Sequence, residues 1–270
     1  MGSHLLSNSL VTGVFIFSLF SFDGMAGSGE TANSSCASFW EEVSLSDLEN
    51  NPTDYLIEWK ELRNNCSAHD GYYDRQLGYI YLASRDFAKA ETAFRNASKM
   101  NPEYLNDLSQ LYMTQSQYVE NREVEVDLLT KAMSILNEVV EVGNVNYSVY
   151  INLGSIYFIL EDYPDAILHL ENSINLQQTS LAFSLLGKSY FNLDRYEEAR
   201  KSIYIAFEMD KTVAEDESAM YVLAMSNVAL KDYENAKITL SLLSKTRPDL
   251  IGTETYQAVF DSIVDGFRGK

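Results

Sequence analysis

The chain has 270 residues, 46% of them hydrophobic and 22% charged, which is the composition of a globular protein with a sizeable core. Its formal net charge of -19 disfavours binding to nucleic acid, whose phosphates must be neutralised by Lys and Arg, and to an anionic membrane surface. Its two cysteines and three histidines form no cluster with the spacing of a metal site. We therefore expect neither a metal nor a cofactor.

The first 26 residues have the pattern of an export signal. Residues 10–22 form an uncharged, mostly apolar run of 13 residues, which is too short to span a bilayer but fits a signal-peptide core. Small residues at Gly24 and Ala26 suit cleavage, although no Lys or Arg precedes the apolar run. The sequence predicts export to the periplasm or cell envelope, with no stable transmembrane span after processing. An uncleaved anchor is the alternative.

Residues 27–70 read as a linker followed by two short helices. Residues 27–35 are rich in Gly, Ser, Asn and Thr, which is typical of a flexible segment. Helices are expected at residues 39–49 and 52–65, and Trp59 and Leu62 belong to an apolar stripe on the second.

The two cysteines, Cys36 and Cys66, bracket these helices. In an exported protein they are expected to form a disulfide, which would join the N-terminal segment to the chain that follows. Two free buried thiols are the alternative.

An internal repeat occupies residues 147–211. Gly154 matches Gly187, and Tyr157 matches Tyr190, at a constant offset of 33 residues. A period of 33 to 34 residues indicates a solenoid of helix pairs. The same offset joins several further pairs: Leu153 with Leu186, Tyr163 with Tyr196, Ala166 with Ala199, Leu170 with Ile203 and Ser173 with Ala206.

The repeated pattern L-G-x-x-Y, then a tyrosine, then A-x-x-x-φ-x-x-A resembles the tetratricopeptide repeat over residues 71–248. The resemblance implies an all-α fold: a right-handed superhelix of about five helix pairs, with N-terminal helices before it and a C-terminal capping helix. Residues 249–270 would form the cap and tail, because residues 253–267 are amphipathic. The marker alanines lie 42, 34, 33 and 37 residues apart: Ala90, Ala132, Ala166, Ala199 and Ala236.

Two features of the repeats carry structural expectations. A glycine inside a helix costs roughly 1 kcal/mol relative to alanine, so Gly78, Gly154 and Gly187 require a packing reason. We expect close contact between the two helices of each repeat at these positions. About eight extra residues within 115–127 predict longer helices or a longer turn in the second repeat.

Enzymatic motifs are not supported. Gly187-Lys188-Ser189 resembles the end of a phosphate-binding loop, but Ala182 stands where that motif needs its first glycine. His69-Asp70 lacks the further ligands of a metal-dependent hydrolase. We expect a protein without enzymatic activity.

The resemblance also implies a binding surface, because the first helix of each tetratricopeptide repeat lines a concave groove. Only two basic residues are expected there, and the Lys and Asn set with which family members clamp acidic chaperone tails is missing. Packing of some of these side chains on the N-terminal or capping helices is the alternative. The predicted groove residues are Tyr72, Arg75, Tyr79, Ser155, Phe158, Lys188, Phe191, Tyr221 and Met225.

Together these observations predict an adaptor or assembly factor that binds a protein or peptide in its groove. The alternative is a structural oligomeric subunit whose groove is filled by its own helices or by those of a neighbouring chain.

Overall fold

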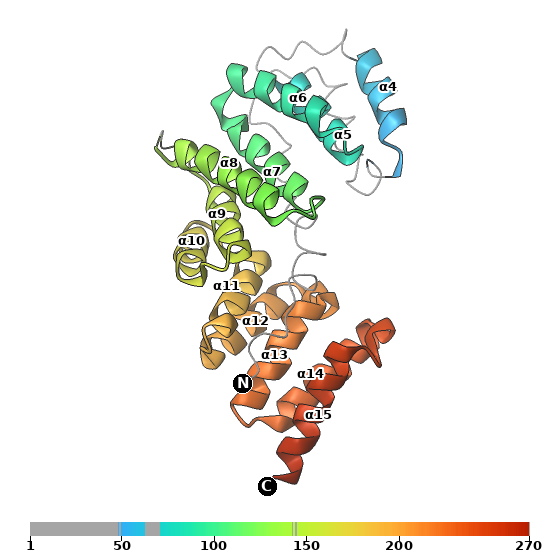
Figure 1. The fold of residues 1–270 in the computed structure, drawn as a ribbon, viewed down its shortest axis with the longest axis vertical. Coiled ribbons are helices and arrows are strands. Elements are labelled where there is room, and N and C mark those ends of the chain that lie inside the picture. Colours follow the sequence, from blue (N-terminus) through green and yellow to red (C-terminus); the bar gives the residue numbers. More distant parts are fainter. Residues whose placement is uncertain (1–47, 49, 63–70, 142, 144, 270) are drawn as a thin grey trace. The chain divides into compact units, whose positions relative to one another are not determined.

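The computed structural model describes residues 48, 50–62, 71–141, 143 and 145–269 (Figure 1). These residues form two compact units, an N-terminal unit ending at Val145 and a C-terminal unit beginning at Asn146. Every regular element of the described chain is a helix. The expected signal segment, most of the helix expected at residues 39–49 and both cysteines, Cys36 and Cys66, lie outside the described residues.

The N-terminal unit contains two helical hairpins preceded by one helix. The hairpins are α5 with α6 and α7 with α8, and α6 also contacts α7. The bounds are α4 Pro52–Leu62, α5 Tyr72–Ala83, α6 Phe87–Met100, the 3-10 helix η4 Pro102–Tyr104, α7 Leu105–Ser116 and α8 Arg122–Glu141.

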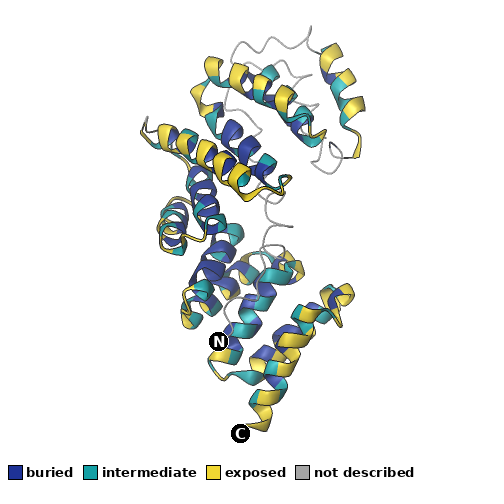
Figure 2. Cartoon of the chain, in the orientation of Figure 1, coloured by how far each residue is buried: buried dark blue, intermediate teal, exposed yellow. Residues whose placement is uncertain are grey.

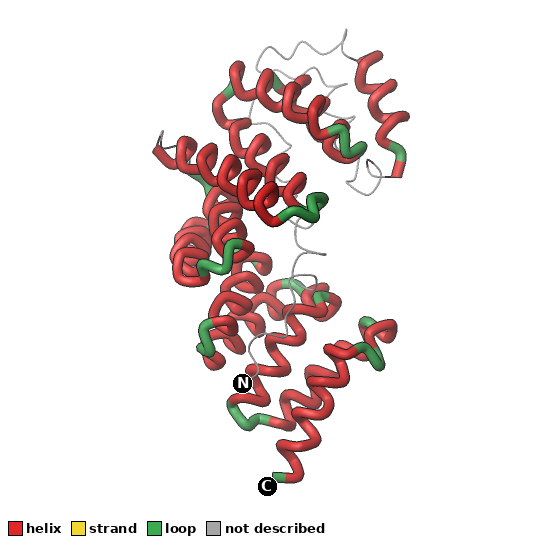
Figure 3. The backbone as a smooth tube through the Cα atoms, in the orientation of Figure 1, coloured by secondary structure: helices red, strands yellow, loops and turns green. Residues whose placement is uncertain are grey.

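The C-terminal unit contains three hairpins and a last helix. Its hairpins are α9 with α10, α11 with α12 and α13 with α14, and α15 packs on the last pair. Figure 3 shows how short the loops between these helices are. The bounds are α9 Tyr147–Ile159, α10 Tyr163–Leu176, α11 Ser180–Asn192, α12 Tyr196–Met209, η5 Lys211–Glu215, α13 Glu217–Ala229, α14 Tyr233–Thr246, η6 Pro248–Leu250 and α15 Glu254–Arg268.

These hairpins confirm the expected all-α solenoid of five helix pairs with a capping helix. Each marker alanine of the second helices is completely buried. In Figure 2, buried residues predominate along α9 and α11, whereas α8 and α15 carry many exposed residues. None of the described helices has the length and apolar character that crossing a bilayer requires.

The two helices of a repeat approach closely where the sequence has glycine. A Cβ atom on Gly154 would lie 2.7 Å from Cγ of Leu170 in α10, and one on Gly187 would lie 2.7 Å from Cδ1 of Ile203 in α12. At Gly78 the obstacle is the ring of Phe94, at 2.6 Å. The packing reason expected for these glycines is therefore confirmed.

Four of the hairpin turns have the same backbone conformation. A residue with φ near +60° ends the first helix, and the next residue is the N-cap of the second. In three of them that N-cap is an aspartate whose carboxylate accepts a hydrogen bond from the backbone N–H of the third residue of the new helix. The turn pairs are Arg85-Asp86, Glu161-Asp162, Asp194-Arg195 and Lys231-Asp232.

The extra residues of the second repeat lengthen both the turn and the second helix. The turn between α7 and α8 runs from residue 117 to residue 121, and α8 has 20 residues where α6, α10, α12 and α14 have 14. Both alternatives predicted for this insertion therefore contribute.

The first and the last hairpin are each covered by an additional helix. Trp59 of α4 is completely buried and stacks on Tyr73 of α5, with the ring centroids 5.3 Å apart. At the other end, Val259 and Ile263 of α15 join a core cluster with Ala224 of α13. The expected amphipathic cap is thus present.

The left-handed turns predict a stabilising substitution. Lys231→Gly should raise the free energy of unfolding by about 0.5 to 1 kcal/mol, because a left-handed backbone costs a side-chain-bearing residue roughly 1–2 kcal/mol and the greater freedom of unfolded glycine offsets only part of that gain. The matched control is Lys237→Gly, six residues later and inside α14, which should lower stability by about 1 kcal/mol. Urea denaturation would measure both, and a Lys231→Gly variant no more stable than wild type would contradict the expectation.

The close approach of α11 and α12 at Gly187 predicts a destabilising substitution. Gly187→Leu should lower the free energy of unfolding by about 1 to 3 kcal/mol, because the new side chain must displace Ile203 of α12. Thermal melting would measure the loss. Gly269→Leu is the control, since a Cβ there meets nothing closer than 3.5 Å. Equal melting temperatures for the two variants would show that α11 and α12 tolerate a larger separation.

Candidate protein-binding surface

In the N-terminal unit, the expected groove residues Tyr72, Arg75 and Tyr79 on α5 are all buried. The guanidinium of Arg75 forms an ion pair with Asp107 of α7, with Nε 2.6 Å from Oδ2. It also lies over the ring of Tyr104, at 4.8 Å from the centroid. Arg75 therefore links neighbouring repeats from within the protein.

The charges of this cluster are satisfied internally. Burial alone would lower the pKa of Arg75, but Asp107 and the nearby tyrosines outweigh it, so the net direction is upward and the guanidinium keeps its charge. Burial and the Asp107 carboxylate raise the pKa of Tyr79, whose protonated hydroxyl donates a hydrogen bond to Asp107 Oδ1. Since buried charges require partners, this arrangement is structural.

In the C-terminal unit, Lys188 of α11 is the second basic residue expected in the groove. Its side chain is only 2% exposed, and its Nζ lies 2.7 Å from Oδ2 of Asp216. The other carboxylate oxygen of Asp216 caps α13 by accepting hydrogen bonds from the backbone N–H groups of Ser218 and Ala219. One aspartate therefore begins α13 and neutralises a lysine of the preceding repeat.

Lys188 and Asp216 each shift the pKa of the other. Burial would raise the pKa of Asp216, but the Lys188 ammonium and the capping hydrogen bonds outweigh it and lower that pKa. Burial lowers the pKa of Lys188, and the Asp216 carboxylate opposes the shift. The Asp216 carboxylate is therefore ionised at neutral pH and remains paired with Lys188.

Two further expected groove residues, on α9, are also buried. The hydroxyl of Ser155 donates a hydrogen bond to the carbonyl oxygen of Ile151, at 2.8 Å. Phe158 packs edge-to-face on Tyr163 of α10, with the centroids 5.6 Å apart. The Ser155 hydrogen bond lies within α9, and the Phe158–Tyr163 contact joins α9 to α10.

The other three expected residues, Phe191, Tyr221 and Met225, are half-buried. Phe191 of α11 contacts Tyr221 of α13 edge-to-face, at 6.1 Å between centroids. Tyr221, Met225 and the adjacent Val228 lie against the core cluster around Ala224 while remaining partly open. We call Phe191, Tyr221, Met225 and Val228 the α11–α13 surface.

The structure thus separates the nine residues expected from the repeat pattern into two groups. Six are buried, and the two basic ones among them are paired with aspartates of the following repeat. Three remain partly accessible, and a role for them in binding stays a prediction. Sequence reasoning missed Asp107 and Asp216 as partners, although Asp216 lies in the acidic run of residues 215–217.

The ion pair between Lys188 and Asp216 predicts that removing the Asp216 side chain is more destabilising than removing an ordinary helix cap. Asp216→Ala should lower the free energy of unfolding by about 3 kcal/mol or more, because it removes both a helix cap and the carboxylate that forms an ion pair with a buried ammonium. Asp210→Ala is the matched control, since Asp210 caps η5 but forms no ion pair with a lysine of the described chain, and it should cost only about 1 kcal/mol. Urea denaturation at pH 7 would compare them, and equal losses would show that the Lys188 pair contributes little.

The dependence of stability on pH provides a second test with the Asp216→Ala variant. The pKa of Asp216 is lower in the folded state, so its stabilising effect is complete above its unfolded pKa and disappears as the pH falls through its folded pKa. The stability difference between wild type and Asp216→Ala should therefore shrink on acidification.

Comparison with known proteins shows what this architecture is similar to. Family models described as tetratricopeptide repeat match residues 75–134, and residues 147–180 and 182–212. No curated protein is a significant match to the sequence.

Solved structures with the same fold share little sequence with the chain. A thermophilic TPR protein from Thermus thermophilus is 20% identical with a TM-score of 0.51, and the match covers 67% of this chain and 98% of that one. Pseudomonas aeruginosa pilF is 17% identical with a TM-score of 0.53, over 73% of this chain and 88% of that one. YrrB, described as a TPR protein with an unusual peptide-binding site, is 16% identical with a TM-score of 0.51, over 75% and 96%. At these identities the likeness concerns the fold alone.

Proposed function

This chain belongs to the tetratricopeptide repeat family, and from that premise we propose that it is a non-enzymatic adaptor that binds a protein or peptide partner at the α11–α13 surface. Repeats of this family typically serve as interaction scaffolds. The peptide-binding site named for YrrB supports a comparable use of the fold in this chain.

The observation that carries the proposal is the partial exposure of large side chains on α11 and α13. Phe191, Tyr221 and Met225 are neither fully packed nor fully open, and two of them touch across neighbouring repeats. Aromatic and Met side chains in such positions typically anchor apolar residues of a partner. The partner that suits this surface is an extended or helical peptide with apolar side chains.

An acidic peptide tail fits this chain poorly. Binding a terminal carboxylate would require a free cation on the inner helices, but Arg75 and Lys188 are buried and paired with Asp107 and Asp216. The large negative net charge adds to that mismatch.

A structural subunit is the competing role. In that case the α11–α13 surface would form fixed contacts with a second copy, and oligomer formation would replace partner binding. The α11–α13 surface is already half-buried within one chain. This favours the adaptor, because the interface between permanent subunits usually buries a larger and more apolar area.

Export to the periplasm or cell envelope is part of the proposal and is supported by the sequence of residues 1–26. The same compartment would favour a disulfide between Cys36 and Cys66.

The binding role predicts a specific loss of affinity. After capture of a partner from the native compartment on the immobilised protein, Phe191→Ala and Tyr221→Ala should each weaken its binding by about 1 to 3 kcal/mol, because each removes an apolar anchor. Titration calorimetry would measure the change. Tyr204→Ala is the matched control, since Tyr204 is an exposed aromatic residue of α12, 56% accessible, and should bind as wild type does.

Thermal melting of each variant separates binding from folding. If both variants bind normally once folded, the α11–α13 surface is not the binding site. If no partner is retained and the same variants dissociate an oligomer in sedimentation velocity, the structural-subunit role replaces the adaptor.

A further inference from the structure

The capping helix α15 lies where the first helix of a sixth repeat would lie, and it is the last helix of the described chain. Counted from the N-cap, the third, sixth and tenth residues of α9, α11 and α13 are all buried. The same positions of α15 are Tyr256, Val259 and Ile263, which pack against the core of the last hairpin. The inner side of α15 therefore follows the register of the repeats.

The outer side of α15 is apolar and open. In α9 and α11 the seventh residue is a buried leucine, and the eleventh is a tyrosine; Tyr157 of α9 stacks on His169 of its own second helix. The corresponding side of α15 carries Phe260, which is 46% exposed, the half-buried Val264, and Phe267, which is 39% exposed. The outer face of a terminal repeat is normally polar. We call these three residues of α15 the α15 seam.

Two opposite charges flank the α15 seam on one side. The seam residues are spaced by four and then three positions, as in a coiled coil, and Asp261 and Arg268 each follow one of its phenylalanines. These two charges lie two helical turns, or about 10 Å, apart. Gln257 donates a hydrogen bond to Asp261, and Arg268 lies 3.9 Å from Asp265 with both side chains 77% exposed. An ion pair this exposed contributes little, so Arg268 can exchange it for another carboxylate.

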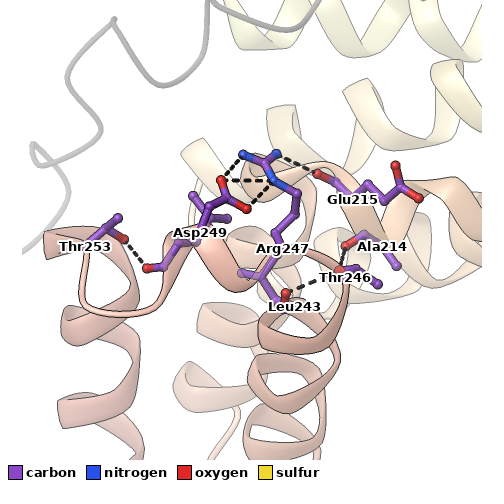
Figure 4. Close-up of polar contacts among 8 residues, drawn as sticks. Ala214, Glu215, Leu243, Thr246, Arg247, Asp249 and Thr253 are labelled. Carbon is purple, nitrogen blue, oxygen red and sulfur yellow. Dashed lines mark hydrogen bonds and ion pairs between the residues drawn. The ribbon is translucent and has the colours of Figure 1, made fainter.

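The start of α15 is fixed to the rest of the C-terminal unit. The hydroxyl of Thr253, the N-cap of α15, donates to the carbonyl oxygen of Leu250 at 2.8 Å (Figure 4). Just before it, Arg247 binds Asp249 with Nη2 2.7 Å from Oδ2, and its Nη1 donates to the carbonyl oxygen of Glu215 at 3.3 Å (Figure 4). The α15 seam is therefore presented on a helix that is held in place.

We propose that the α15 seam is an interface between two copies of this chain, packed antiparallel about a two-fold axis near Val264. In that arrangement Asp261 of each copy lies opposite Arg268 of the other, so two ion pairs flank the apolar contact. A parallel pair would instead place each acidic residue level with its own copy.

The same charges argue against another occupant. A basic helix of a partner would suit the acidic chain as a whole, but Arg268 would repel it at the seam, whereas a second copy uses both charges. The α15 seam shares no residue with the α11–α13 surface, so this inference does not depend on the proposed function. One helix face is a small interface, and we therefore expect a reversible monomer–dimer equilibrium.

Charge reversal tests the arrangement. Sedimentation equilibrium of the full chain over a range of concentrations would measure the dissociation constant. Asp261→Arg and Arg268→Asp should each raise it about tenfold or more, because symmetry replaces both ion pairs with like charges. The double variant should restore the wild-type value. An equimolar mixture of the two single variants should also associate, since each supplies the charge that the other has lost.

Glu254→Arg is the matched control. It changes the net charge by the same amount in the exposed first turn of α15, outside the seam, and should leave the dissociation constant unchanged. Phe260→Ala should raise the dissociation constant in the wild type and in the double variant alike, because it removes apolar contact area. Thermal melting would confirm that each variant is folded.

Three results would overturn the inference. The first is a wild type that stays monomeric at the highest concentration reached, and in that case loss of a captured protein by Phe260→Ala would show that the seam binds a different chain. The second is a double variant that associates no better than the single ones. The third is a dimer that Phe191→Ala dissociates and the α15 variants do not, which would assign the contact to the α11–α13 surface.

Discussion

The contact between the two helices of each repeat is the constraint on which the rest of this structure depends. In three of the five repeats it is made where a glycine of the first helix meets a large side chain of the second, as at Gly154 and Leu170. Glycine weakens a helix, so the residue is favoured only because the neighbouring backbone must come close. The turn that follows reinforces the same geometry, since a left-handed residue and an N-cap reverse the chain within three residues. Once the hairpins form, each one buries the apolar side of its neighbour within the same unit.

The fold could be predicted from the sequence because its determinants are local and repeated. The spacing of Gly154 and Gly187 and of the marker alanines identifies the hairpins without any long-range information. The surroundings of the expected groove residues were less accessible to prediction, because the repeat pattern gives the side of the helix on which a residue lies but not its partner. Arg75 and Lys188 lie on the expected side, yet each is neutralised by an aspartate about thirty residues later. Nothing in the spacing of an isolated basic residue reveals such a partner.

The paired cations also explain the chemical character of the C-terminal unit. With Lys188 held by Asp216 and Arg247 held by Asp249, the accessible part of the inner helices offers rings, a thioether and the carboxylate of Glu217. Binding at the proposed surface would depend on shape and apolar area first, and the negative charge of the chain would then discriminate among partners of similar shape. Family membership alone would not distinguish such a surface from one that binds acidic tails.

The bonds that join successive repeats have a consequence for how the C-terminal unit opens. In a solenoid, the end repeat usually frays first, because it has a neighbour on one side only. In this chain Lys188 ties α11 to the start of α13, while Arg247 and Thr246 tie the end of α14 back to η5. The last hairpin therefore cannot detach without also breaking contacts of the hairpin before it. Amide hydrogens of α11 and α13 should exchange with solvent in one cooperative event, so the α11–α13 surface would be present as a whole or absent as a whole.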